Sequence, residues 1–266
     1  MSVDGRTLLA DVELAVAPGR LLALVGPTGA GKTTLLRCLA GLLAPGSGRV
    51  LVGDRDLATL GPKERARQVG WVPQLLPELP EIRVRDLVAS GRFSHQGLLG
   101  RSTPDDRAAV DAALEQMGLE ARADDPLGEL SGGQLRLALV ARALAQDAPL
   151  LLLDEPTAGV DSPRALRLME RLLELLPERS LVLVSHDLNL AAQHADDVLL
   201  LSDGRIRAQG APAEVLTEAR LTEAFGPGLH VDTWGDVSHL AGRPRVLPRR
   251  ADPKGDGRGL APYLHS

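Results

Sequence analysis

Residues 21–43 read LLALVGPTGAGKTTLLRCLAGLL, and this stretch decides the fold of the chain. Its first five residues are apolar and have the length of a strand buried on both faces. A Leu- and Ala-rich helical pattern follows the glycines and is expected to end at Leu43, because Pro45-Gly46 cannot continue a helix. Between the strand and the helix stands the complete G-x-x-x-x-G-K-[ST] spacing of a phosphate-binding loop, at Gly26, Gly31, Lys32 and Thr33.

The residue types of this loop suit phosphate. Glycines let consecutive backbone N–H groups converge on one anion, and the helix expected to begin near Lys32 adds the positive end of its dipole. Lys32 can reach phosphate oxygens as a point charge, and the Thr33 hydroxyl is a natural Mg²⁺ ligand. A glycine-rich turn with a solvated lysine is the alternative, but the flanking strand and helix favour the phosphate loop. We expect nucleotide contacts at Gly26, Pro27, Thr28, Gly29, Ala30, Gly31, Lys32, Thr33 and Thr34.

The composition is that of an ordinary globular protein, with 44% hydrophobic residues among 266. A formal charge of −5 argues against a dedicated nucleic-acid binder, which usually carries a basic face. Cys38 is the only cysteine, which excludes an intrachain disulfide and a cysteine-rich metal site. The chain opens without an apolar signal region and contains no run of about 18 apolar residues. We therefore expect a cytosolic protein that meets membranes only through a partner.

Apolar runs and helix signals alternate over most of the chain, which predicts a mostly parallel sheet with helices on its faces. The predicted strands are part of 8–16, 21–25, 49–52, 69–72, 150–153, 181–184 and a hairpin over 198–207. The predicted helices are 62–67, one from the cap Thr103 to Gly118, 131–145, 163–176 with Ser162 as its cap, and one capped by Asp187. Residues 75–147 are predicted to form a helical subdomain inserted into this core.

The strand predicted over residues 150–153 ends in two carboxylates, Asp154 and Glu155. In a phosphate-loop protein this strand end lies beside the phosphates, where Asp154 would hold Mg²⁺ and Glu155 would hold the attacking water. For this pair alone, two solvated turn acids or a helix cap are the alternative.

Residues 130–134 read LSGGQ and give the sharpest signal in the chain. Ser131 and Gln134 have capping-box spacing, which by itself predicts a well-capped helix start. Gly132 and Gly133 expose the backbone N–H groups of the same helix end, which would make a second anion site. Two phosphate-binding surfaces in one chain suggest a sandwich with another chain.

Together these motifs resemble the nucleotide-binding subunit of ABC transporters, from about Gly5 to Gly226. The resemblance adds a Q-loop at Gln74, a D-loop at residues 158–161 and a switch histidine at His186. It implies an α/β fold over residues 1–226: a P-loop NTPase (RecA-like) core with a parallel sheet, an N-terminal antiparallel β subdomain and the inserted helical subdomain. Residues 227–266 are expected to be a C-terminal extension, whose end at 249–266 has too little apolar material to pack and is expected to be disordered.

The resemblance also implies an ATPase that works as a head-to-tail dimer with a second copy of itself or with a similar chain. Each ATP would lie between the phosphate loop of one subunit and the signature of the other, formed by Ser131, Gly132, Gly133 and Gln134. By the same resemblance Glu155 orients the attacking water, His186 contacts the γ-phosphate, and Gln74 joins Thr33 and Asp154 at Mg²⁺. Taken alone, Gln74 and His186 would be ordinary structural residues.

Residues 84–95 and 186–225 resemble the ATPases of importers for iron-siderophores, haem and cobalamin. The implied complex has separate integral-membrane permease subunits and a substrate-binding protein, with this chain at the cytoplasmic face of the membrane and no nucleic-acid partner. The alternatives are an importer of another solute, such as metal ions or amino acids, and a soluble ABC ATPase of repair or translation. The candidates for permease contact, each of which could instead pack in the core, are Leu75, Leu76, Leu79 and Phe93.

Several positions depart from the family pattern. Val3 stands where an aromatic residue usually stacks on adenine, and Leu137 stands where an arginine usually follows the signature. The D-loop reads AGVD where the family more often has SALD, and residues 91–95 read GRFSH where the importer subgroup often has G-R-x-P-H. None of these changes removes a catalytic group. His95 is expected to be a surface residue near the permease contact and not a metal ligand.

Overall fold

The structure, a computed structural model, describes residues 2–3, 6–7, 9–74, 78, 80–97, 101–176, 178–235 and 240–249. Leu75, Leu76 and Leu79, the side chain of Val3, and residues 250–266 of the C-terminal extension lie outside these described residues.

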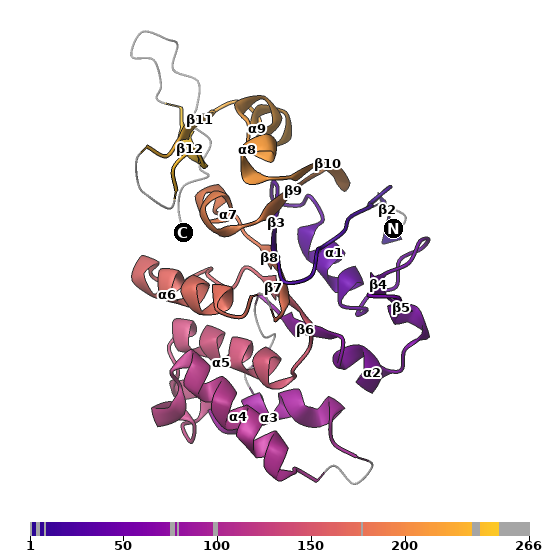
Figure 1. Cartoon of the computed structure of the whole chain (residues 1–266), viewed down its shortest axis with the longest axis vertical. Coiled ribbons are helices and arrows are strands. Elements are labelled where there is room, and N and C mark those ends of the chain that lie inside the picture. Colours follow the sequence, from indigo (N-terminus) through magenta and orange to yellow (C-terminus); the bar gives the residue numbers. More distant parts are fainter. Residues whose placement is uncertain are drawn as a thin grey trace.

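Six strands form the central sheet (Figure 1), in the order β10-β9-β3-β8-β7-β6. Their bounds are Leu21–Val25 (β3), Val69–Val72 (β6), Leu150–Asp154 (β7), Ser180–Val184 (β8), Asp197–Ser202 (β9) and Arg205–Gly210 (β10). Neighbouring strands run parallel except β10, which returns antiparallel to β9 through a turn at Asp203 and Gly204. The predictions of a mostly parallel sheet and of a hairpin over 198–207 are confirmed.

The strand β3 is buried on both faces and separates two hydrophobic cores. Leu21, Ala23 and Val25 belong to one core, and Leu22 and Leu24 belong to the other, as the alternation of side chains along a strand requires. Helix α1 (Lys32–Leu39) contributes to the second core. The first core is shared with the helices α5 (Gly132–Ala145), α6 (Ser162–Leu173) and α7 (Leu188–His194).

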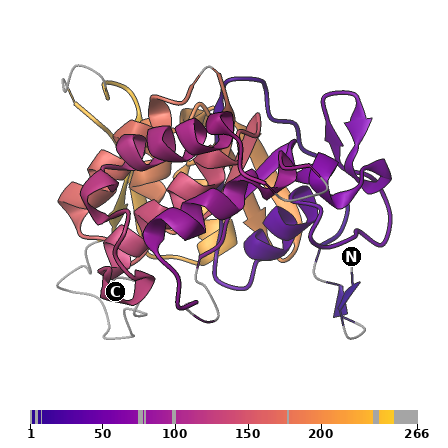
Figure 2. The same ribbon diagram turned by 90° about the horizontal axis from the view of Figure 1, so that it is seen from below.

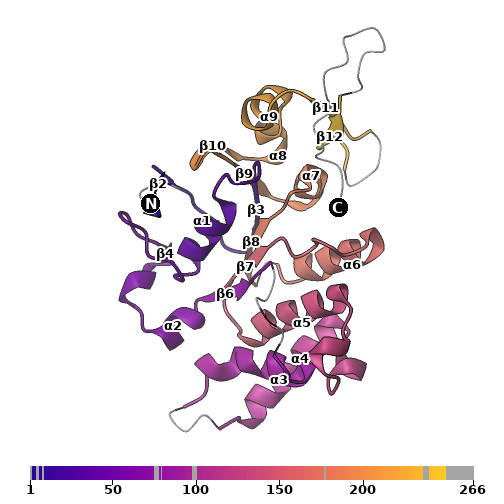
Figure 3. The ribbon, with the colours of Figure 1, turned by 180° about the vertical axis from the view of Figure 1, so that it is seen from behind.

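Two small antiparallel sheets lie near α1 (Figure 3), together with η1 (Leu57–Thr59) and α2 (Pro62–Ala66). Their strands are β1 (Ser2–Val3), β2 (Arg6–Thr7), β4 (Leu51–Val52) and β5 (Arg55–Asp56). The strand predicted over 8–16 is wrong, because residues 9–16 form no strand. Asp11 has a φ of 52°, which breaks an extended backbone, and Ala10 N donates to Gly204 O in a turn at 2.9 Å.

A bundle of helices, which lies between β6 and β7 in the chain, occupies one end of the molecule (Figure 1), and Figure 2 looks onto the bundle from that end. It contains α3 (Val84–Ser90), η2 (Gly91–Ser94), α4 (Pro104–Met117), η3 (Glu120–Arg122), η4 (Leu127–Glu129) and α5. Both predicted ends of α4 are confirmed: Thr103 is its N-cap, and Gly118 follows it with a φ of 64°. None of the helices among the described residues has the length and apolar composition of a membrane span.

The predicted end of α1 is wrong. The helix ends at Leu39 instead of Leu43, because Gly41 adopts a φ of 65° and Leu42 N donates back to Arg37 O at 2.9 Å. This is a glycine C-cap, so the helix stops before the downstream proline can act.

The predicted cap of α6 is also wrong. Asp161, not Ser162, is the N-cap, and its carboxylate accepts from Arg164 N at 3.1 Å. The helix ends at Leu173, three residues before the predicted end.

The chain beyond the sheet forms α8 (Pro212–Val215), α9 (Glu218–Phe225) and an antiparallel hairpin of β11 (Leu229–Thr233) and β12 (Pro244–Pro248). The hairpin lies at the end of the molecule opposite to the helical bundle (Figure 1). No strand is predicted in this part of the chain, so the hairpin is an addition to the predicted fold.

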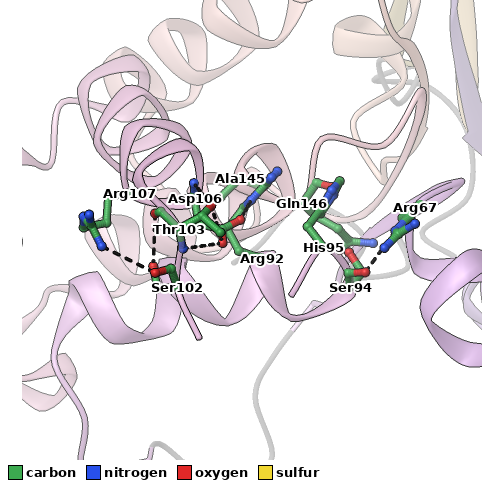
Figure 4. Close-up of polar contacts among 10 residues, drawn as sticks. All are labelled: Arg67, Arg92, Ser94, His95, Ser102, Thr103, Asp106, Arg107, Ala145 and Gln146. Carbon is green, nitrogen blue, oxygen red and sulfur yellow. Dashed lines mark hydrogen bonds and ion pairs between the residues drawn. The ribbon is translucent and has the colours of Figure 1, made fainter. Parts of the chain in front are cut away.

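A buried ion pair fixes η2 within the helical bundle (Figure 4). Arg92 and Asp106 are both buried, and Arg92 Nε donates to Asp106 Oδ1 at 2.9 Å. Arg92 also donates to Ala145 O at 2.9 Å, at the end of α5. The hydrogen bond from Thr103 N, and after it the Arg92 guanidinium, lower the pKa of Asp106 from 3.8 to about 2. One carboxylate therefore joins η2, α4 and, through Arg92, α5.

We expect Asp106→Asn to lower the free energy of unfolding by about 3 kcal/mol, because it leaves the buried Arg92 charge without a counter-ion. Asp111→Asn is the matched control. The Asp111 carboxylate lies 2.5 Å from Arg85 but its side chain is 61% exposed, so we expect a loss below about 1 kcal/mol.

The effect of Asp106→Asn has a defined pH dependence. Because the pKa of Asp106 is depressed in the folded state, its contribution is present above pH 3.8 and is lost as the pH falls toward about 2. Urea unfolding at neutral and at acidic pH measures both effects. Equal losses for the two variants at neutral pH would contradict the role given to the buried pair.

Candidate functional site

The loop after β3 is shaped by glycines with left-handed φ values. Gly26 has a φ of 153°, and Gly31, which precedes α1, has a φ of 101°. At Gly26 a Cβ atom would lie 1.9 Å from the carbonyl oxygen of Leu201, so no larger residue fits. No described side chain caps the N-terminus of α1, which leaves its first backbone N–H groups available to an anion.

Lys32 lies over this loop and not in solvent. It is 6% exposed, and its Nζ donates to Gly26 O at 2.7 Å and to Pro27 O at 3.0 Å. Burial lowers the pKa of Lys32, while the carboxylates of Glu155 and Asp154 act in the opposite direction. The ammonium group is thus held where phosphate oxygens in the loop could replace carbonyl oxygens as its partners.

Thr33 and Asp154 provide the oxygen donors that Mg²⁺ prefers. Thr33 Oγ1 donates to Asp154 Oδ1 at 3.4 Å, although the two residues come from α1 and β7. Burial raises the pKa of Asp154, and the hydrogen bond from Thr33 opposes that shift. The described residues contain no group of three or more His, Cys, Asp or Glu that could hold a metal ion. A hydroxyl and one carboxylate fit Mg²⁺, which usually shares its coordination with substrate phosphates.

Glu155 contacts Gln74 and His186, which come from two distant segments of the chain. It follows β7 with a φ of 51°, and its backbone N donates to Val184 O of β8 at 3.2 Å. Gln74 Nε2 donates to Glu155 Oε2 at 2.7 Å, and His186 Nε2 lies 2.5 Å from Glu155 Oε1. The structure therefore brings together the three residues expected to be catalytic, because Gln74 and His186 both contact the Glu155 carboxylate.

The LSGGQ segment begins helix α5 as expected. Ser131 Oγ accepts from Gln134 N at 3.3 Å, and Ser131 N donates to Gln134 Oε1 at 3.0 Å, which confirms the capping box. Ser131 and Gly132 are exposed. The helix α5 packs on α3, α4 and β6, whereas α1 packs on β7, so the two predicted phosphate-binding surfaces belong to different parts of the chain.

Comparison with known proteins agrees with this geometry. The family model described as ABC transporter matches residues 9–158. The chain belongs to the ABC transporter family. Among its relatives, the ferric enterobactin transport ATP-binding protein of Escherichia coli is 37% identical over 91% of this chain and 89% of its own length. The hemin import ATP-binding protein of Thermobifida fusca is 40% identical over 94% of this chain and 86% of its own length.

The match to a third relative covers little more than half of that protein. The cobalamin import ATP-binding protein of Halobacterium salinarum is 40% identical over 88% of this chain, and the match spans 58% of that relative.

Solved ABC structures share the fold. An ABC transporter in an inward-facing conformation superposes with a TM-score of 0.77 at 27% identity, over 90% of both chains. A dimeric ATP-binding cassette in a post-hydrolysis state with ADP and phosphate gives a TM-score of 0.69 at 28% identity, over 77% of this chain and 90% of the other.

One charged residue next to this site, Arg136, is not among the residues predicted from the sequence. Arg136 of α5 is buried, and its guanidinium donates to the backbone carbonyls of Gln74, Pro73 and Ala158, the last two at 3.5 and 3.4 Å. These bonds tie α5 to the loop that carries Gln74 and to the D-loop. The available signal was an arginine placed between the apolar residues of α5, which also contains Arg142.

Two further residues singled out from the sequence lie on or next to η2. Phe93 is 62% exposed. His95, expected at the surface, is half-buried, and its Nε2 lies 2.9 Å from Gln146 O.

We expect Lys32→Ala to weaken Mg²⁺-ATP binding by about 100-fold, since it removes the cation that faces the phosphates. Lys63→Ala is the matched control, because Lys63 is exposed and donates to Gln96 O at 2.8 Å, away from the loop. Titration with a fluorescent ATP analogue measures both affinities. Unchanged binding by Lys32→Ala would refute the assignment of the phosphate loop.

Proposed function

We propose that this chain is the ATP-hydrolysing subunit of an importer and drives uptake of an iron-siderophore, haem or cobalamin-type solute through separate permease subunits. The observation that carries the proposal is the convergence of Gln74 and His186 on the Glu155 carboxylate, next to a phosphate loop.

The proposed roles follow from the positions of the side chains. Backbone N–H groups of residues 28–34 and the Lys32 ammonium bind the phosphates of ATP. Thr33 and Asp154, with Gln74, hold Mg²⁺, which would neutralise phosphate charge when bound. Glu155 orients the attacking water, and His186, whose Nε2 already faces Glu155, contacts the γ-phosphate.

A second copy of the chain is proposed to complete each site. The exposed Ser131 and Gly132 lie at the start of α5 and have no contact with the loop of their own chain among the described hydrogen bonds. In a two-fold head-to-tail dimer, Ser131, Gly133 and Gln134 of each subunit would bind the ATP held by the other. The dimeric cassette with ADP and phosphate supports this arrangement.

The permease is proposed to dock between α2 and the helical bundle. A cavity of about 270 Å³ opens there beside the exposed Leu42, and Trp71, Arg142 and Gln146 contribute to its lining. Phe93 projects from the neighbouring η2, which is held to α2 by the bond from Arg67 Nε to Ser94 O at 2.9 Å. Exposed apolar groups around a cavity are typical of a protein-binding surface. The chain would then work at the cytoplasmic face of the membrane.

The proposed solute class is inferred from the relatives and not from the site, because the site is proposed to bind ATP and not the transported solute. The names of the relatives specify ferric enterobactin, hemin and cobalamin, which are all large metal chelates. We propose the same chemical class for this chain, with a substrate-binding protein that delivers the solute to the permease.

We expect Glu155→Gln to bind ATP normally and to accumulate as a closed dimer, because hydrolysis falls by about 100-fold or more without the carboxylate. Light scattering after size exclusion, with and without ATP, measures the dimer. A variant that stays monomeric with ATP, alongside a wild type that hydrolyses as a monomer, would contradict the sandwich.

The decisive test of the proposed function is the partner and the solute. A tagged chain should co-purify with permease subunits from membranes, and its deletion should abolish uptake of a ferric siderophore, haem or cobalamin. Uptake of all three without the chain would refute the solute class. Recovery of ribosomes or DNA in place of a permease would favour a soluble ABC ATPase.

A further inference from the structure

The C-terminal hairpin packs on the helix that follows His186. The strands β11 and β12 pair from Leu229 with Pro248 to Thr233 with Pro244. Helix α7 contacts both β12 and β3, so it lies between the hairpin and the strand that leads into the phosphate loop (Figures 1 and 3). The hairpin lies outside residues 9–158, which match the family model.

The hairpin holds the N-terminal end of α7 through one side-chain amide. Asn189 Nδ2 donates to Val246 O at 3.0 Å, and Val246 N donates to Asn189 Oδ1 at 2.8 Å. The Asn189 side-chain amide thus exchanges two hydrogen bonds with the backbone of Val246, as a peptide group of a neighbouring strand would. The Val246 side chain is buried in the same core as Ala191 and Ala192 of α7.

The hairpin holds the C-terminal end of α7 through a cation. Arg243 Nη1 donates to Ala192 O at 2.9 Å and to Ala195 O at 3.1 Å. Carbonyls in the last turn of a helix lack intrahelical partners, and a positive charge there also interacts favourably with the helix dipole. Arg243 therefore satisfies carbonyl oxygens at the end of α7 that the helix itself leaves open.

The hairpin itself is anchored to α9. Glu218 Oε2 lies 2.7 Å from His230 Nδ1 and accepts from Val231 N at 3.4 Å, and its other oxygen accepts from Arg249. The hairpin is thereby fixed to a second helix and can serve as a rigid support for α7.

Helix α7 is coupled directly to the site. Its N-cap is Asp187, whose carboxylate accepts from Asn189 N at 2.8 Å, and His186 immediately precedes this cap. The helix has seven residues, and so short a helix depends on tertiary contacts for its position. Any displacement of α7 therefore moves His186 relative to Glu155.

We propose that Asn189 and Arg243 are positioning residues, through which the C-terminal hairpin holds α7 at both ends and sets His186 against Glu155. The inference rests on the proposed ATPase function and adds a support for its switch histidine. The phosphate loop has no part in these contacts. Their loss should therefore reduce turnover without reducing ATP affinity.

The first test compares two arginines of the same hairpin in the full chain. Arg243→Ala should lower kcat by about tenfold with KM changed less than about twofold, because only the alignment of His186 is disturbed. Arg245→Ala is the matched control, since Arg245 lies over the Trp234 ring, 4.9 Å from its centroid, and makes no hydrogen bond or ion pair with α7 among the described residues. Arg243→Lys, which keeps a cation at the helix end, should recover part of the turnover. Equal kcat values for Arg243→Ala and Arg245→Ala would overturn the inference.

The second test asks whether the effect passes through His186. In a His186→Ala background, Arg243→Ala should change kcat by less than about twofold, whereas a general loss of stability would add to the first defect. The NMR signal of the His186 ring, identified by its absence from His186→Ala, should shift in Arg243→Ala and not in Arg245→Ala. An unchanged signal would overturn the inference whether or not the chain hydrolyses ATP. A wild type without turnover would instead overturn the proposed function.

Discussion

Parallel strand direction is the constraint on which the rest of this structure depends. Since β3, β8 and β7 lie side by side and run the same way, the residues that follow their carboxyl ends meet at one edge of the sheet. The phosphate loop follows β3, Glu155 follows β7 and His186 follows β8. The backbone hydrogen bonds between these parallel strands therefore place the residues of the site near one another.

Much of the fold could be predicted because a strand covered on both faces reads as an unbroken apolar run, as in Leu21–Val25. Residues 9–16 could not, because their partial alternation resembles a half-buried strand while Asp11 breaks the extended backbone. The helix ends were misplaced where a local cap, at Gly41 or Asp161, acted before the more obvious signal. The β11–β12 hairpin packs on α7 and α9, and such contacts between distant segments cannot be predicted from a local sequence pattern.

The candidate site divides in the same way. Glu155 could be named from the strand end that carries it, and Gln74 and His186 could be named only through the resemblance to a family; the structure brings all three together. Arg136 and Arg243 could not, because their partners are backbone carbonyls. Every residue type supplies a carbonyl, so the sequence contains no matching partner for either arginine. Such supports become visible only when the path of the chain is known.

Gly26 of the phosphate loop lies very close to Leu201 of β9, so the shape of the loop depends on the packing of the sheet as well as on the binding of phosphate. A side chain at position 26 would push the loop and β9 apart even in the absence of ATP. Substitutions there would damage folding and nucleotide binding together, and only a measurement on protein shown to be folded could separate the two defects. The most recognisable glycine of the motif belongs to the architecture of the sheet as much as to the binding of its ligand.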